Sequence, residues 1–257
     1  MAADGAPSTL DRAEAVFTAL SEHGFLTLTE ITAVTGIPRS SAHRLLTRMV
    51  RLRWLLRVGD NYELGVRLFE LGTPGRRNHW FHRIAYPRLQ ELHARTGFVV
   101  HMAYLDGWDA MYWERLGTGR FGAELPTRVG TQWPAHRTAL GKVLLANESD
   151  AELARTAPAV LTPGTAATIT DHDALGRQLD QVRADLIAHD RGEALAGVGC
   201  VAAAAHAGRA RTSDGHTTTV AISVTAPLDR LDRRWSQLVL ATAAEITRAA
   251  GPNPMAE

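Results

Sequence analysis

The sequence predicts an α+β protein of two domains, the first helical with one β-hairpin and the second built on a largely antiparallel sheet. Apolar residues recur at helical spacing in the first fifty residues, whereas alternating runs at 98–105 and 219–225 indicate strands. A stretch at 73–78 that contains glycine, proline and arginine lies between them. With 257 residues and 45% apolar content, the chain is long enough for two cores of modest size.

Three helices are predicted in the first domain. The first is indicated by apolar residues at i, i+3, i+4 and i+7, namely Ala13, Val16, Phe17 and Leu20. It should end near Gly24, after which Thr29 is the expected N-cap of a second, shorter helix. Gly36 can adopt the left-handed conformation that ends this helix, and Pro38 then starts the third, from Arg39 to about Leu52.

The third helix has two distinct faces. Its apolar stripe consists of Ala42, Leu45, Leu46 and Met49. The opposite face carries only polar and cationic residues, namely Ser40, His43, Arg44, Thr47, Arg48 and Arg51. Two short apolar runs at 55–58 and 62–64 then flank the turn-forming triplet 59–61, which predicts a hairpin. This order of elements is typical of a winged helix–turn–helix.

Positive charge is concentrated in this segment. No acidic residue lies between Glu30 and Asp60, yet six arginines do: Arg39, Arg44, Arg48, Arg51, Arg53 and Arg57. The whole chain has 28 basic and 27 acidic residues, so the excess is local. A solvated helix face is the alternative, but such faces usually mix both signs of charge. The pattern therefore favours a surface that binds double-stranded DNA.

The predicted DNA-binding residues fall into two groups. Short polar groups and an arginine in the first turns of the third helix suit contacts to base edges: Ser40, Ser41, His43 and Arg44. Cations farther along suit phosphate contacts: Arg48, Arg51 and the hairpin residue Arg57. Arg39 suits either role, and Thr29 is included as the residue at the start of the second helix.

The remaining elements follow from local patterns. A short helix from Val66 should end at Gly72, and the break at 73–78 marks the domain boundary. Helices are expected around Ile84–Leu92, at 138–145, at 173–188 and at 231–249. Strands at 98–105 and 110–113 form a second hairpin around Asp106–Gly107, and a further strand covers 219–225. The polar segment 206–218 is expected to be a loop between two strands.

Several classes of function are disfavoured. Cys200 is the only cysteine, so neither an internal disulfide nor a multi-cysteine zinc site is expected. Cys200 could act as a nucleophile, and His101, His136 and His206 could join it as metal ligands, but no spacing supports either interpretation. No signal peptide and no apolar run of about 18 residues is present, which predicts a cytoplasmic protein without membrane contact. We expect no catalytic residues, metal or cofactor.

The chain resembles the IclR family of bacterial transcriptional regulators. In the first domain the resemblance rests on 28–31, 35–40, 43–46 and 62–65, within Ser8–Gly72. Downstream it rests on 134–142, 161–163, 169–171, Asp190, Glu193, Gly197, 200–202 and 221–224. It implies a DNA-binding domain with the start of a linker helix at 1–72, a linker at 73–80 and a GAF-like effector-binding domain at 81–257.

The resemblance also implies an effector site. By position its residues are Ala139, Leu140, Asp190, Cys200, Ser223 and Thr225. In the 219–225 strand, Ser223 and Thr225 share a face with Ala221; from the alternation alone, this face could instead meet solvent. The expected helix start at 138–141 offers free N–H groups to a carboxylate, so a small organic acid is the expected effector.

Three positions depart from the family pattern. Arg137 stands where a small residue is common, Leu186 replaces a frequent glycine, and the 206–218 segment is longer than usual. Arg137 could enter the pocket or lie outside in a surface ion pair, and the second is favoured. These departures affect the choice of ligand rather than the fold.

The sequence thus predicts a ligand-responsive transcriptional regulator of a catabolic or metabolic operon. The resemblance implies a homodimer or homotetramer, which would bind a pseudo-palindromic operator. One alternative is a small-molecule-binding enzyme or carrier with a vestigial DNA-binding head. Another is an architectural protein that binds DNA without sequence specificity.

Overall fold

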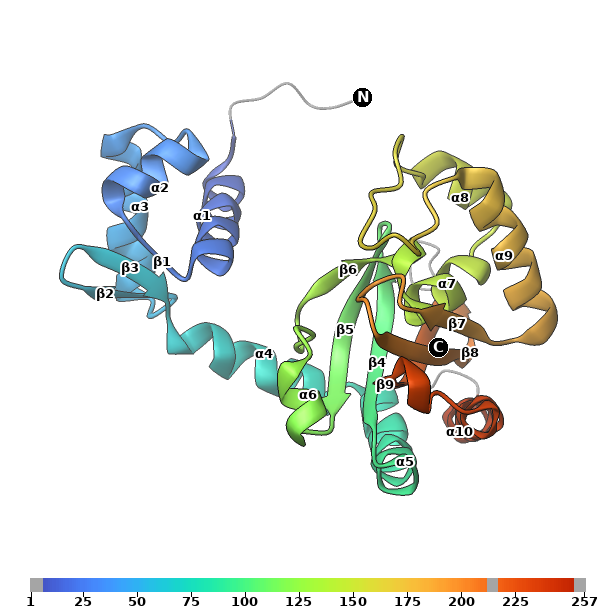
Figure 1. The fold of residues 1–257 in the computed structure, drawn as a ribbon. Helices are drawn as coiled ribbons and strands as arrows, with labels where there is room; N and C mark the ends of the chain where they lie inside the picture. The colour runs from blue at the N-terminus through green and yellow to red at the C-terminus, as the bar shows by residue number, and fades with distance from the viewer. Residues whose placement is uncertain (1–6, 212–216, 252–257) are drawn as a thin grey trace. The chain divides into compact units, whose positions relative to one another are not determined.

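A computed structural model describes residues 7–211 and 217–251 of the chain. The chain divides into two compact units, Met1–His79 and Trp80–Glu257. The division lies inside the segment 73–80, where the sequence predicts a linker. Each unit is described by itself (Figure 1).

The N-terminal unit is a winged helix–turn–helix. Its helices are α1 (Thr9–His23), α2 (Leu28–Thr35), α3 (Arg39–Arg51) and α4 (Val66–Asn78). Its strands are β1 (Phe25–Thr27), β2 (Leu55–Val58) and β3 (Asn61–Leu64), which form an antiparallel sheet in the order β1-β3-β2. The predicted three helices and hairpin are confirmed, and β1 is an additional strand that the sequence pattern did not indicate.

The start of α2 differs from the prediction. Thr27, not Thr29, is the N-cap, and its hydroxyl accepts a hydrogen bond from the amide of Glu30 while the Glu30 carboxylate accepts one from the amide of Thr27. This reciprocal capping box satisfies two backbone amides at the start of the helix, which explains why Thr27, and not Thr29, is the N-cap of α2. The other end is as predicted, because Gly36 ends α2 with a φ of 68° in the left-handed region.

The helix that begins at Val66 is longer than predicted. α4 continues through 73–78, where the sequence pattern indicates a break, and contains Pro74. A proline inside a helix removes one hydrogen bond, here the bond to the carbonyl of Glu70. The loss of one bond does not end α4, so the predicted break is wrong.

The C-terminal unit contains a six-stranded antiparallel sheet in the order β6-β5-β4-β9-β8-β7. Its strands are β4 (Val99–Asp106), β5 (Asp109–Leu116), β6 (Gln132–Pro134), β7 (Ala188–Arg191), β8 (Val198–Arg211) and β9 (Thr217–Pro227). Its α-helices are α5 (Trp80–Thr96), α6 (Arg120–Glu124), α7 (Ala139–Ala146), α8 (Asp150–Thr156), α9 (His172–Asp185) and α10 (Arg233–Ala250). Two single 3₁₀ turns are η1 (Ala135–Arg137) and η2 (Leu228–Arg230).

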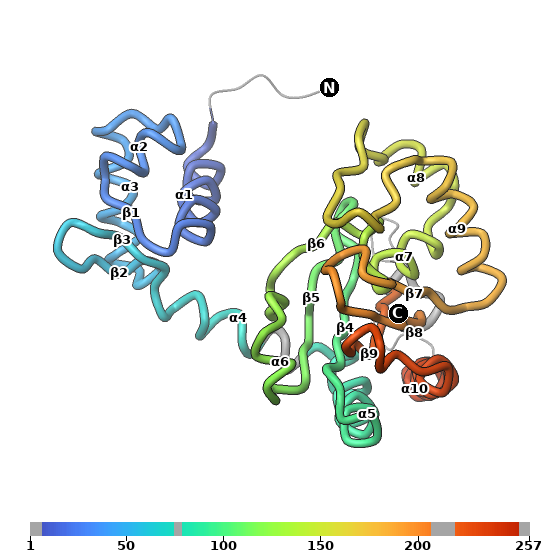
Figure 2. Tube along the Cα trace, viewed as in Figure 1, coloured from blue at the N-terminus to red at the C-terminus, as the bar shows by residue number. Residues whose placement is uncertain are grey.

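Helices cover both faces of this sheet. Strands β4 and β9, far apart in the sequence, lie side by side at its centre (Figures 1 and 2). Val220, Ile222 and Val224 of β9 pack in the core with α5 and α10, whereas Ala221 packs in the core with α7 and α9. The predicted two faces of the strand are confirmed, and because Ser223 and Thr225 are buried, the solvent-facing alternative for them is wrong.

Two element boundaries in this unit differ from those predicted from the sequence. The helix expected at 173–188 ends at Asp185, and Ala188 already belongs to β7. The loop expected at 206–218 is partly strand, because β8 extends to Arg211 and β9 begins at Thr217. The rest of that predicted loop, 212–216, lies outside the described residues.

Leu186 ends α9 in a conformation that suits glycine. Its φ is 59° and its ψ is 18°, in the left-handed region, and its amide bonds to the carbonyl of Val182. A residue with a Cβ pays roughly 1–2 kcal/mol for this conformation. Because Leu186 is 67% exposed, its side chain recovers little of this cost through packing.

We therefore predict that Leu186→Gly stabilises the C-terminal unit. The gain should be about 0.5–1 kcal/mol, because relief of strain exceeds the extra entropy that glycine adds to the unfolded chain. Urea unfolding measures it as a higher midpoint. Leu186→Ala is the matched control, since alanine keeps the strained conformation; equal midpoints for the two variants would disprove the explanation.

Candidate DNA-binding face and effector cavity

Helix α3 buries one stripe and presents the other to solvent. Ala42, Leu46 and Met49 are at most 1% exposed and fix the helix in the core of the N-terminal unit. Leu45 of the predicted stripe is only partly buried. The predicted polar face is exposed at Ser40, His43, Arg44, Thr47, Arg48 and Arg51.

The arginines of this segment divide into two groups. Arg53 pairs with Glu70 of α4 at 2.9 Å, and Arg57 donates to the carbonyl of Gly59 at 2.9 Å and contacts Asp60 at 3.4 Å. For Arg44, Arg48 and Arg51, the part of the chain that the structure describes provides no ion pair. Three exposed guanidinium groups on one helix therefore keep their charge available for phosphate or base contacts.

The predicted residues around the start of α3 have different environments. Arg39 donates to the hydroxyl of Thr29 at 3.1 Å, so Thr29 contacts α3 instead of capping α2. Ser40 and His43 are exposed, whereas Ser41 is half-buried. The nine predicted residues thus lie on α2, α3 and the hairpin of one unit, and their contacts with DNA stay predictions.

A small cavity lies in the C-terminal unit, with a volume of about 30 Å³. It is lined by His101, Tyr112, Leu125, Pro126, Thr127, Trp133, Thr138, Asp190, Ala194, Leu195, Val198, Cys200 and Thr225. Three residues of the predicted effector site are among them, namely Asp190, Cys200 and Thr225. A volume of this size holds only a few waters.

Three predicted effector residues do not line this cavity. Ala139 and Leu140 begin α7, and their side chains are buried in the core between α7 and the sheet. Thr138, the N-cap of α7, lines the cavity instead. Ser223 is fully buried beside Ala202 and His101 in the sheet, and its hydroxyl has no hydrogen-bond partner among the described residues.

His101 is the main lining residue that the sequence interpretation missed. It is 1% exposed, and its ring nitrogens contact the hydroxyls of Thr127 at 3.0 Å and Thr225 at 3.2 Å. Burial first, and then the charge of Arg115, lower its pKa to about 3, so the ring is neutral. His101 interrupts the apolar run 98–105, and a polar residue inside such a strand could have indicated a buried polar site.

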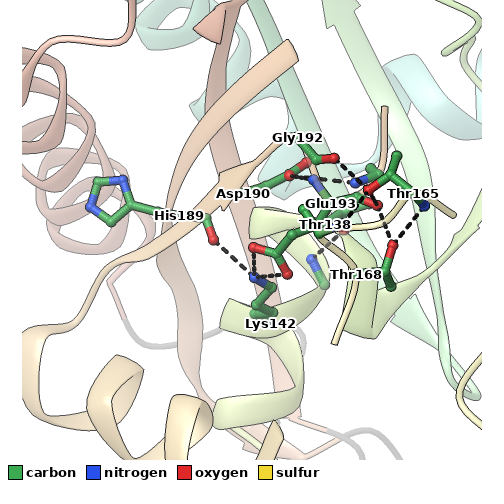
Figure 3. Close-up of polar contacts among 11 residues, drawn as sticks. Thr138, Lys142, Thr165, Thr168, His189, Asp190, Gly192 and Glu193 are labelled. Carbon is green, nitrogen blue, oxygen red and sulfur yellow. Dashed lines mark hydrogen bonds and ion pairs between the residues drawn. The ribbon is translucent and has the colours of Figure 1, made fainter. Parts of the chain in front are cut away.

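A buried ion pair supports one wall of the cavity. The ammonium of Lys142, the only lysine in the chain, contacts both carboxylate oxygens of Glu193 at 2.6 and 2.7 Å and the carbonyl of His189 at 2.9 Å (Figure 3). Lys142 is completely buried and Glu193 is 6% exposed. These contacts join α7 to β7 and to the turn after it.

The same turn is held by hydrogen bonds from two sides. The Asp190 carboxylate accepts from the amides of Glu193 at 2.7 Å and Ala194 at 3.4 Å. The hydroxyls of Thr165 and Thr168 donate to the carbonyls of Gly192 at 2.7 Å and Glu193 at 2.6 Å (Figure 3). The segment that carries Asp190 and Ala194 into the cavity wall is therefore fixed at several points.

The pKa values of the Asp190 carboxyl group and the Cys200 thiol are both strongly raised. Burial is the main cause that raises the pKa of Asp190 to about 6, and the nearby charge of Glu193 adds to it. Burial, followed by the charge of Asp190, raises the pKa of the Cys200 thiol. The thiol lies 3.2 Å from the hydroxyl of Thr225 and stays protonated at neutral pH, which opposes a nucleophilic role.

Arg137 does not line the cavity. Its guanidinium donates to the carbonyl of Thr162 at 2.8 Å and also to the hydroxyl of that residue. It therefore lies outside, as favoured from the sequence, but bonded to neutral groups of the 161–163 segment instead of an acid.

Breaking the Lys142–Glu193 pair should strongly destabilise the C-terminal unit. Lys142→Met leaves the Glu193 carboxylate buried without its cation, and we expect a loss of about 3–5 kcal/mol in the free energy of unfolding. The double variant Lys142→Met/Glu193→Met removes both charges and should recover a large part of the loss. Urea unfolding tests both variants, and a single variant as stable as the parent protein would refute a structural role for the pair.

Two family models together match most of the chain. The model described as "Bacterial transcriptional regulator IclR C-terminal" matches residues 77–250, and the "IclR helix-turn-helix domain" matches 9–59. None of the described helices is long and apolar enough to cross a membrane.

Individual relatives agree with these matches. The transcriptional regulators XynR and KdgR of Escherichia coli K12 are 34% and 30% identical over 180 and 190 residues. The matches cover 69% and 73% of this chain and 71% and 72% of the relatives. A solved IclR homolog from Microbacterium hydrocarbonoxydans, complexed with 4-hydroxybenzoate, shares the fold with a TM-score of 0.81 at 23% identity, covering 95% of this chain and 99% of that one.

The relatives are regulators of transcription, not enzymes. The α+β fold with a winged helix–turn–helix, the exposed arginines of α3 and the family matches agree with one another. This chain belongs to the IclR family of bacterial transcriptional regulators.

Proposed function

We propose that the protein binds a pseudo-palindromic operator through α3 and changes its DNA affinity when a small organic acid occupies the effector cavity. It would act in the cytoplasm on a catabolic or metabolic operon. The observation that carries the proposal is the exposed face of α3, where Arg44, Arg48 and Arg51 have no ion pair among the described residues. In a major groove, such a helix offers cations to phosphates and an arginine to guanine.

An organic acid is the proposed effector because of the start of α7. The hydroxyl of Thr138, which lines the cavity, already accepts from the amide of Gly141. The amides of the two residues between them, at the positive end of the helix dipole, suit a carboxylate. The homolog solved with 4-hydroxybenzoate provides an example of an aromatic acid bound to a protein of this fold.

The cavity must enlarge to hold such a ligand. Sites for small molecules usually measure a few hundred Å³, about ten times the volume found here. Three of the lining residues, Leu125, Pro126 and Thr127, are here called the cover and follow a segment that contains Gly117 and Gly119. We propose that this cover moves outward when the effector binds.

We also propose that the protein forms a homodimer or homotetramer. On α4, Val66, Phe69 and Leu71 are 57%, 72% and 50% exposed, and Leu10 of α1 is 75% exposed. Val66 and Phe69, three positions apart, share one face of α4, and exposed apolar side chains on one face favour association with another protein surface. A dimer would present its two α3 helices to half-sites about 34 Å apart, or a multiple of that distance.

Arg44→Ala should weaken operator binding by about 1–3 kcal/mol, because it removes the arginine best suited to a base edge. The operator is first selected from random DNA with the parent protein, and binding is then measured by gel shift at fixed salt. Arg53→Ala is the matched control, because Arg53 is held by Glu70 and should contribute little.

Two outcomes would change the interpretation. Equal affinity of Arg44→Ala and the parent protein for the selected sequence would contradict the assignment of α3. A preference for the selected DNA over random DNA below about 10³-fold would instead favour the architectural alternative.

A carboxylate effector should raise the melting temperature. Acetate, benzoate and 4-hydroxybenzoate are tested in a thermal-shift assay, where a ligand at 100 times its Kd stabilises by roughly 2.7 kcal/mol. Ala194→Leu places a larger side chain in the cavity wall and should abolish the shift. Ala196→Leu, at an exposed position of the same turn, should keep it. An unchanged shift in Ala194→Leu would rule out this cavity as the site.

A further inference from the structure

The effector cavity contains an acidic group but no permanent cation. Of its thirteen lining residues, Asp190 is the only carboxylate and His101 the only imidazole, and none is lysine or arginine. An anion that enters a buried site needs an opposite charge, a set of donors or a proton, because the cost of burying an unpaired charge is high. Asp190 adds to this cost at neutral pH.

The charges around Asp190 do not cancel its own. The charge of Lys142 on α7 acts on Asp190, but both oxygens of Glu193 lie within 2.7 Å of its ammonium group. The remaining titratable groups that face Asp190, Tyr112 on β5 and Cys200 on β8, have raised pKa values and are neutral. The group of Lys142, Glu193 and Asp190 therefore has a net charge of −1 when Asp190 is ionised.

The geometry of Asp190 leaves one oxygen available. Its Oδ1 accepts from the amides of Glu193 and Ala194, which fixes the carboxylate at the cavity wall. No hydrogen bond recorded for the described residues reaches Oδ2. A protonated Oδ2 can donate to a carboxylate in the cavity while Oδ1 keeps both of its donors.

We propose that Asp190 takes up one proton when a carboxylate effector binds, and that its Oδ2–H then donates to that carboxylate. The proton comes from solvent, and no other bond forms or breaks. Two carboxyl groups that share a site hold one proton between them, because both cannot remain ionised at close range. This inference rests on the proposed carboxylate effector.

The raised pKa of Asp190 allows it to take up this proton near neutral pH. In the free protein its pKa is about 6, already above that of an ordinary aspartate, so the adjacent anion has less far to raise it than it would for an ordinary aspartate. Above pH 6 the free protein lacks the proton and the complex holds it. The Kd for the effector should therefore rise about tenfold per pH unit until the pH reaches the pKa of the complex.

His101 is the competing proton acceptor. Its ring faces Thr127 of the cover, Thr225 on β9 and Tyr112 on β5, and the charge of Arg115 opposes its protonation. With a pKa of about 3, it would need a much larger shift than Asp190 to be protonated above pH 6. The observations therefore favour Asp190.

Calorimetry on the full-length protein tests the inference with acetate, benzoate and 4-hydroxybenzoate as probes. Titrations at pH 6.5 and 8.0 should give a Kd about 25-fold higher at pH 8.0 when the complex keeps the proton throughout, in a range where each probe is ionised. Titrations in phosphate and in Tris, which differ in ionisation heat, should report uptake of about one proton at pH 7.5. Binding without proton uptake and with equal Kd values would overturn the inference.

Asp190→Asn separates protonation from mere contact. The amide keeps an oxygen for the two backbone donors and offers an N–H where the protonated acid offers its O–H. We expect binding that does not depend on pH and, at pH 8.0, is at least ten times tighter than in the parent protein. A variant that fails to bind any probe, although its thermal unfolding shows an intact fold, would contradict the inference.

Two control variants complete the test. Asp229→Asn removes an exposed carboxylate in η2 and should retain the full pH dependence. His101→Gln should retain it too; if His101→Gln removes the dependence while Asp190→Asn keeps it, the proton belongs to His101 and the inference is wrong. If none of the probes binds at either pH, the carboxylate effector itself is wrong, and the inference falls with it.

Discussion

The effector domain depends on the buried contact between Lys142 and Glu193. It connects α7, β7 and the turn that follows β7, three parts that contribute to one wall of the cavity. Burying both charges is costly, and the cost is offset because the ammonium has three close oxygen partners while the turn is held independently by Asp190, Thr165 and Thr168. The pair thus supports one wall of the cavity and adds no net charge beside it.

Patterns that act over a few residues could be predicted from the sequence. The stripe of α3, the left-handed Gly36 and the hairpin around Gly59–Asp60 depend on neighbouring residues only. The capping box at Thr27 was also readable, since glutamate follows three positions later. The passage of α4 through Pro74 was not, because local propensity favours a break there and the rest of the helix outweighs it.

The cavity could be predicted only in part, because its walls meet through long-range pairing. His101 on β4 and Thr225 on β9 are 124 positions apart, and strand register decides that their side chains touch. Three residues assigned from the family resemblance, Asp190, Cys200 and Thr225, line the cavity. Ala139 and Leu140 were assigned in the same way, but they do not line it. The side chains of Ala139 and Leu140 are buried in the core, whereas Thr138, just before them, lines the cavity. A sequence motif does not distinguish a residue that lines the cavity from a neighbour that is buried in the core.

The contact between Arg53 and Glu70 has a mechanical consequence for the DNA-binding unit. Arg53 lies two residues after the end of α3, Glu70 lies in the second turn of α4, and the backbone of Gly65 lies against that of Arg53 with no room for a side chain. These contacts lock the first turns of α4 to the recognition helix, whereas Pro74 weakens the helix only beyond them. A rotation of the first turns of α4 would therefore carry α3 with it and leave the exposed face of α3 unchanged. In the dimer proposed above, regulation of this kind would alter the distance between the two α3 helices on DNA and not the sequence that each of them reads.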